Sequence, residues 1–184
     1  GLPGAVCATL NDRVLTFLNR ARKVTLEPLS VRDVDAYYQR AFEELDLDIP
    51  GDLRLRAARA TQGSPYMLQL IGYNIGNRCK TGEHVTPEQV DGAIEASKAD
   101  FENDVCETTL AALSDQDVAF LDAMTDDEDA VSRISDVAKR MSVTPDYAQK
   151  YRRRLIDAGV IEQARRGYVR FAVPYMADYL RSQL

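Results

Sequence analysis

The sequence predicts a mainly α-helical protein, in which a helical bundle is followed by a winged helix-turn-helix domain with a small β-hairpin. Three observations predict this fold. Apolar residues recur at helical spacing through most of the 184-residue chain. Helix, turn, helix and hairpin signals follow one another between Ala130 and Phe171. The two ends also differ in charge: the first 129 residues hold twelve Lys/Arg and twenty-four Asp/Glu, whereas the remainder holds eleven and five.

N-cap signals begin the helices of the first part. Ser30 is followed three residues later by Asp33, and Thr86-Pro87 places a hydroxyl residue before a proline that suits the first helical position. Gly63-Ser64-Pro65 is a break, after which Pro65 starts a further helix. The predicted helices are Ala5–Leu18, Ser30–Glu44, Leu53–Thr61, Pro65–Ile75 and Pro87–Ala112. The inward stripe predicted for the second of these helices is Val31, Val34, Tyr38, Phe42 and Leu45.

The C-terminal part begins with a helix over Gln116–Met124, which Ser114 and Asp117 introduce, and an acidic hinge over Asp126–Asp129 follows. Ile134, Val137, Ala138 and Met141 then form one apolar face of a short helix.

Thr144 and Pro145 begin the next helix, and Ala158-Gly159 ends it. Tyr147, Tyr151, Leu155 and Ile156 make that helix amphipathic. Val160-Ile161 and Tyr168–Phe171 are the strands of the hairpin, with a turn that ends at Arg166-Gly167, and a last helix is predicted from Pro174.

Cations gather on the second helix of the helix-turn-helix and on the hairpin. Such cations suit the phosphates on either side of a DNA groove, so double-stranded DNA is the predicted partner. The candidate DNA-binding residues are Lys150, Arg152, Arg153, Arg165, Arg166 and Arg170. An ordinary solvated face is the alternative. Gln149 is the one amide on this helix, so the prediction concerns phosphate contacts and not base readout.

Several classes of protein are not indicated. The chain has no GxxxxGK[ST] motif, no Ser-His-Asp set and no metal-ligand cluster, so catalysis by this chain alone and a metal site are not predicted. Its three cysteines form no CxxC, which favours free thiols in a reducing cytoplasm. No apolar run approaches the ~20 residues that cross a bilayer. We therefore expect a cytoplasmic protein without a membrane partner.

The order of several short motifs resembles the second half of an AAA+ ATPase. These motifs are Gly1–Pro3, Thr16–Ala21, Leu26–Ser30, Ala60–Gly72, Leu113–Met124 and Arg154–Pro174. They look most like the bacterial and archaeal group similar to origin-recognition initiator ATPases. The resemblance implies a helical AAA+ lid-type domain over residues 1–112, with 1–29 as the remnant of a nucleotide-binding domain, and a winged helix over 113–184.

The resemblance also implies roles for individual residues. Arg20, or alternatively Arg22, matches an arginine directed at the γ-phosphate in a neighbouring subunit, although Arg20 could instead cap its helix or pair with Glu27. Gly63 and Pro65 match the sensor-2 motif, so the candidate cofactor-binding residues are Gly63, Pro65 and Tyr66. Tyr66 stands where the family has an arginine, and either stacks on the base or simply packs, with Arg59 as a substitute cation.

We therefore expect a C-terminal fragment of an ATP-binding AAA+ protein, in which the lid couples nucleotide state to a DNA-binding winged helix. ATP and Mg²⁺ belong to the full-length parent, which is expected to be an ATPase, and other copies of that ATPase are further partners. The alternative is a protein-interaction module without DNA binding, which carboxylate partners for Arg152 and Arg153 would favour. A transcription regulator with an effector-binding helical half is a third hypothesis.

Overall fold

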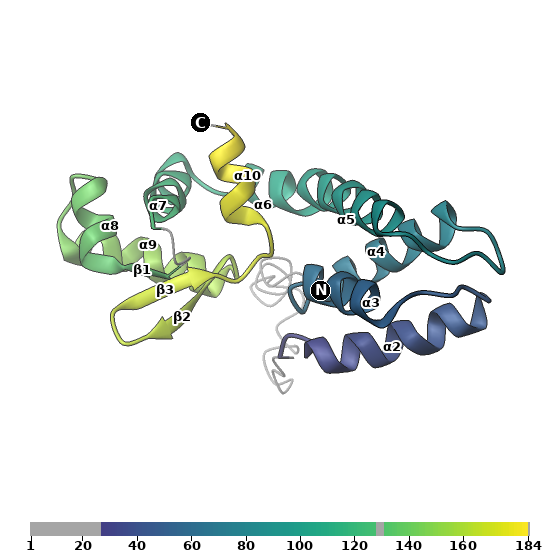
Figure 1. Cartoon of the computed structure of the whole chain (residues 1–184). Coiled ribbons are helices and arrows are strands. Elements are labelled where there is room, and N and C mark those ends of the chain that lie inside the picture. The colour runs from purple at the N-terminus through teal and green to yellow at the C-terminus, as the bar shows by residue number, and fades with distance from the viewer. Residues whose placement is uncertain (1–26, 128–130, 184) are drawn as a thin grey trace, which may run out of the picture. The chain divides into compact units, whose positions relative to one another are not determined.

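The computed structural model describes residues 27–127 and 131–183, and they form two compact units (Figure 1). The helical unit comprises residues 27–104, and the C-terminal unit comprises 105–127 and 131–183. The described chain is mainly helical with one small sheet, as predicted. Among these residues, no helix combines the length and apolar character needed to span a membrane.

Four helices build the helical unit, and the N-caps predicted at Ser30 and Thr86 are confirmed. The helices are α2 (Val31–Glu44), α3 (Gly51–Ala60), α4 (Pro65–Arg78) and α5 (Pro87–Phe101). Ser30 and Ser64 each accept a hydrogen bond from the amide three residues on. Thr86 forms a full capping box with Gln89, so its side chain and backbone both join the helix end.

All four helices contribute buried residues to the core of the helical unit. Tyr38, Ile71 and Ile75 are fully buried, and the Tyr38 hydroxyl donates to the Leu68 carbonyl at 2.8 Å. Two residues of the predicted inward stripe are not buried: Val31 is 39% exposed and Leu45 is 51% exposed. Val31 is the first residue of α2, and Leu45 is its C-cap.

The long helix predicted for Pro87–Ala112 is interrupted. Helix α5 ends at Phe101 and is followed by a π-helical segment, η2 (Glu102–Glu107), and by the short α6 (Thr108–Ala111). The two compact units divide inside η2, between Asp104 and Val105. The domain boundary at 112/113 stays a prediction.

The C-terminal unit contains the helix-turn-helix and hairpin in the predicted order. Its further elements are α7 (Asp115–Thr125), β1 (Val131–Arg133), α8 (Ile134–Arg140), α9 (Pro145–Asp157), β2 (Ile161–Arg165), β3 (Tyr168–Phe171) and α10 (Met176–Gln183). The antiparallel strand order is β1-β3-β2, with a register shift between Gln163 and Arg165 (Figure 1). Strand β1 was not predicted, because its three residues show no strand pattern of their own and pair only with the distant β3.

Helices α8 and α9 bury part of the faces that the sequence predicts for them, whereas Met141 and Ile156 are only half-buried and Tyr147 is exposed. Ile134, Val137 and Ala138 are buried in α8, and Tyr151 and Leu155 are buried in α9. The last helix starts later than predicted, at Met176 and not at Pro174. Tyr175 has a φ of +58°, a left-handed conformation that cannot continue a helix begun at Pro174.

The acidic hinge predicted over Asp126–Asp129 serves in part as an anchor. Asp127 accepts two hydrogen bonds from the Arg140 guanidinium, at 2.6 and 2.8 Å, and Arg140 also donates to the Ala123 carbonyl. The end of α7 is therefore joined to the end of α8. The hydrogen bonds from Arg140 hold the pKa of Asp127 below its ordinary value.

We predict that Asp127→Asn lowers the free energy of unfolding at neutral pH by on the order of 1 kcal/mol, because it removes a bidentate ion pair near the surface. A carboxylate whose pKa is lowered in the folded state stabilises the fold above its unfolded pKa and loses that effect as pH falls through the folded value. In urea unfolding measured between pH 7 and pH 3, the free energy of unfolding should therefore fall less for Asp127→Asn than for the wild type.

Asp126→Asn is the matched control. The Asp126 carboxylate lies 3.5 Å from the Arg140 guanidinium and its side chain is 63% exposed. Removing its charge should therefore change the free energy of unfolding little. Equal effects of the two substitutions would contradict the anchoring role of Asp127.

Candidate nucleic-acid interface

Helix α9 presents one polar face because its other face is buried. The Thr144 hydroxyl accepts from the Tyr147 amide at 3.3 Å and sets the start of the helix. Ala148, Tyr151 and Leu155 are buried. Since successive residues are separated by about 100° around the axis, this burial turns Lys150 and Arg153 toward solvent.

Lys150 and Arg153 are both exposed on this face. The Lys150 ammonium lies 6.0 Å from the centroid of the Tyr151 ring. Within residues 27–127 and 131–183, neither side chain forms an ion pair with a carboxylate. Their charges are therefore available to an external anion.

Arg152 is half-buried and is engaged by neutral groups. Its Nη2 donates to the Gln163 side-chain oxygen in β2 at 2.7 Å, and its Nη1 donates to the Gln149 side-chain oxygen at 3.4 Å. Its Nε is buried and has no hydrogen-bond partner among the described groups. Arg152 thus keeps its charge while it connects α9 to the hairpin.

Arg154, the remaining cation of the helix, has a structural partner. Its Nη2 lies 2.8 Å from Oδ2 of Asp117, a side chain that is only 1% exposed. The same oxygen accepts from the Ser114 hydroxyl at 2.6 Å. Arg154 therefore belongs to the packing of α7 against α9.

The hairpin carries two exposed arginines at its turn. The Arg165 guanidinium lies 4.0 Å from the centroid of the Tyr168 ring, which orients it by a cation–π contact. Arg166 is exposed and precedes Gly167, whose φ is +79°. In the part of the chain that the structure describes, neither arginine is paired with a carboxylate.

Arg170, the third predicted hairpin cation, differs from the other two. Its Nε donates to the Glu162 carboxylate of the neighbouring strand, with 55% of the Arg170 side chain exposed. The cross-strand partner offsets its charge. The surface that we call the basic strip therefore consists of Lys150, Arg153, Arg165 and Arg166, with Arg152 between the helix and the hairpin.

Sequence reasoning missed two participants. Tyr147 was assigned to the buried face of α9, yet it is 43% exposed and accepts a hydrogen bond from the Tyr151 hydroxyl at 2.8 Å. That bond raises the pKa of Tyr151 above its ordinary value. Gln163 had no signal in the sequence, because its role depends on the pairing that brings β2 against α9.

The candidate cofactor-binding residues Gly63 and Pro65 shape the start of α4. Gly63 has a φ of +76°, and its carbonyl accepts from the Leu29 amide at 2.9 Å. Ser64 caps the helix through the Met67 amide, and Pro65 is its first residue. These local roles account for Gly-Ser-Pro without a nucleotide.

Tyr66, the third candidate, is held from one side. Its hydroxyl donates to Asp104 at 2.6 Å, and its ring lies 6.0 Å from that of Phe101. The side chain is 37% exposed, and the bond to Asp104 raises its pKa. Arg59 is exposed on α3, whereas Arg20 and Arg22 lie outside the described residues.

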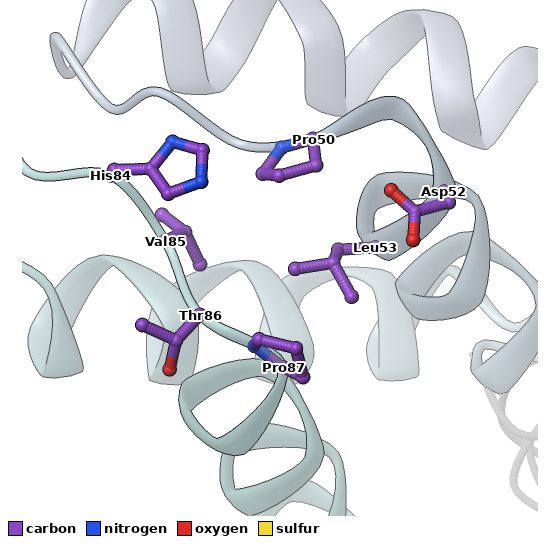
Figure 2. Close-up of a pocket in the computed structure, with 7 residues that line it drawn as sticks. All are labelled: Pro50, Asp52, Leu53, His84, Val85, Thr86 and Pro87. Carbon is purple, nitrogen blue, oxygen red and sulfur yellow. The ribbon is translucent and has the colours of Figure 1, made fainter.

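A shallow surface pocket of about 250 Å³ lies elsewhere in the helical unit (Figure 2). Its lining residues are Pro50, Asp52, Leu53, His84, Val85, Thr86 and Pro87. Leu53 and Val85 face each other across it, and His84 is hydrogen-bonded to Asp48 at 2.7 Å. The pocket contains none of the candidate cofactor-binding residues. Across the described residues, no group of His, Cys, Asp and Glu is arranged to hold a metal ion.

Comparisons with known proteins gave two kinds of match. Residues 103–180 match the model of a family described as a domain of unknown function, DUF8462. The comparison with curated proteins gave no match.

Among solved structures, the chain is similar to RuvB of Thermotoga maritima, described as a Holliday junction branch migration motor. The identity is 17% and the TM-score 0.40, over 82% of this chain and 49% of that one. A lysine-to-arginine mutant of the same protein matches at 16% identity with a TM-score of 0.39, over 82% and 48%. The chain thus spans about half the length of these structures.

We predict that Gly63→Ala lowers the free energy of unfolding of the helical unit by about 2–4 kcal/mol. The alanine would have to adopt a left-handed backbone conformation, and its Cβ would overlap with neighbouring atoms. An added Cβ would lie 2.7 Å from the Pro28 Cβ and 3.0 Å from the Leu29 carbonyl oxygen. Urea unfolding followed by circular dichroism would measure the loss.

Gly82→Ala is the control in the same unit. Gly82 has a nearly identical φ of +77°, but its nearest contact to an added Cβ is Asp46 at an ordinary 3.8 Å. Gly82→Ala should lower the free energy of unfolding by about 1–2 kcal/mol, through the left-handed backbone alone. If both substitutions had the same effect, close packing against Pro28 would not be the reason for Gly63.

Proposed function

We propose that the C-terminal unit binds duplex DNA through its phosphate backbone, without sequence preference. The observation that carries this proposal is the basic strip: four exposed cations, on α9 and on the hairpin turn, with no carboxylate partner in the described part of the chain. Cations on a helix and on an adjoining hairpin can contact phosphates at separate points along a duplex. The bonds of Gln149 to Arg152 favour backbone contacts over base readout.

The alternative function is a protein-interaction module without DNA binding. Carboxylate partners for Arg152 and Arg153 would favour it. Arg152 is bonded to two glutamines, and Arg153 has no ion-pair partner among the residues described. The net positive charge of this surface is therefore not cancelled by those contacts.

We further propose that the chain is the lid and winged-helix part of an AAA+ protein. The resemblance in motif order supports this proposal, and the Gly63–Pro65 turn with its capped helix is compatible with a sensor-2 position. In the parent, ATP and Mg²⁺ would bind to the preceding nucleotide-binding domain, with Arg20 directed at a neighbouring subunit. Because Tyr66 has replaced the family's arginine and is bonded to Asp104, the lid would close without a cation at this position.

This second proposal has a direct test. The parent protein should contain a GxxxxGK[ST] motif ahead of Gly1 and should bind MgATP in a titration calorimeter. A parent that lacks the motif and binds no nucleotide would contradict the AAA+ assignment and leave the DNA proposal standing.

We predict that the chain binds a short duplex with a Kd of about 10⁻⁴–10⁻⁶ M near physiological salt, and that affinity falls steeply as salt increases. Changing Lys150, Arg153, Arg165 and Arg166 together to Glu should abolish this binding, because each loses a phosphate contact and gains repulsion. Fluorescence anisotropy with a labelled duplex over a series of salt concentrations would measure both effects. Single neutralisations should each reduce the log–log salt slope by about 0.9.

The control makes the same change in charge on the helical unit. Arg32, Arg40, Arg59 and Lys80 are exposed there, and their joint replacement by Glu should leave most of the binding intact. Unchanged binding after reversal of the basic strip, or equal loss in the control, would contradict the proposed interface.

A further inference from the structure

One guanidinium adds a side-chain hydrogen bond between α9 and the hairpin to the packing of their buried residues. Among the described residues of α9, Arg152 makes this bond, donating to the Gln163 side-chain oxygen of β2 at 2.7 Å. It is also bonded to Gln149 on its own helix at 3.4 Å. Both glutamine side chains are exposed, whereas Arg152 is half-buried between them.

The chemistry of arginine determines how the two amides are oriented. A guanidinium has only N–H donors and no acceptor, so each glutamine must direct its carbonyl oxygen toward Arg152. The Nε2 groups of Gln149 and Gln163 then point away from it. Neither Nε2 group donates to an acceptor among the described residues. Two exposed amide donors are thus left without an acceptor among the described residues, one on α9 and one on β2.

Resting on the DNA-binding function proposed above, we infer that Arg152 is a positioning residue and not a phosphate contact. It holds the hairpin against α9 and orients both glutamine amides, so that the basic strip presents donors and no acceptors. Phosphate oxygens accept hydrogen bonds and donate none, which such a surface matches. Bidentate recognition of adenine by glutamine requires both the oxygen and the nitrogen of the amide, and the oxygens are occupied.

The test compares charge-conserving substitutions at two positions of the full chain. Arg152→Lys keeps the charge but loses the planar fork that reaches two carbonyls. Arg40→Lys, at an exposed position of α2 outside the basic strip, is the control. We expect Arg152→Lys to lose several-fold in affinity for a labelled duplex, and Arg40→Lys to bind like the wild type. Wild-type affinity in Arg152→Lys would overturn the inference, since charge alone would then be sufficient.

A double-mutant cycle with Gln163→Met tests the connection to the hairpin. If Arg152 acts through Gln163, Gln163→Met should weaken binding, and the double variant with Arg152→Lys should lose no more than the weaker-binding single variant. If the affinity losses of the two single variants multiplied in the double variant, or if Gln163→Met had no effect on affinity, the two residues would act independently. A wild-type preference among duplexes of different sequence that Gln149→Met abolishes would overturn the donor-only surface.

A measurement without DNA separates this inference from the function on which it rests. In ¹⁵N–¹H spectra, the Nε2 resonances of Gln149 and Gln163 should both shift in Arg152→Lys and stay in place in Arg153→Lys. Amide signals that are unchanged by Arg152→Lys would refute the connection, whether or not the chain binds DNA. If those shifts occur but the wild type binds no duplex, the connection exists and the DNA-binding function is wrong.

Discussion

The arrangement of the C-terminal unit depends on the ion pair between Asp117, whose side chain is 1% exposed, and Arg154, whose side chain is 51% exposed. The Asp117 carboxylate completes the capping box of α7 with Ser114 and accepts from the Arg154 guanidinium of α9. Because a buried carboxylate is costly without a cation, the pair restricts the rotation of α9 about its axis. That rotation decides which side chains of α9 pack inside and which reach solvent.

Much of the fold could be predicted because its signals are local. Ser30, Ser64, Thr86, Ser114 and Thr144 each bond to the amide three residues ahead, and a hydroxyl residue at such a position is recognisable in a single sequence. The features that escaped prediction depend on distant partners. Strand β1 exists through its pairing with β3, and the exposure of Val31 and Leu45 at the two ends of α2 is not encoded in the apolar spacing of that helix.

The candidate interface shows the same division. The separation of acidic and basic residues along the chain located the cationic end, but a count of arginines could not say which of them are available. Arg140 is bonded to Asp127, Arg154 to Asp117 and Arg170 to Glu162, each through a carboxylate from another element. The available cations are those for which the fold supplies no such partner, and only three-dimensional contacts reveal that set.

Gly167 at the hairpin turn has a left-handed backbone, and an added Cβ would meet nothing within 4 Å. The Gly167 carbonyl nevertheless accepts a hydrogen bond from the Ile134 amide at 3.1 Å, so the backbone of the turn is joined to the start of α8. Side chains at this exposed turn can therefore change with little effect on the interior. A change in the length of the hairpin, in contrast, would displace that hydrogen bond.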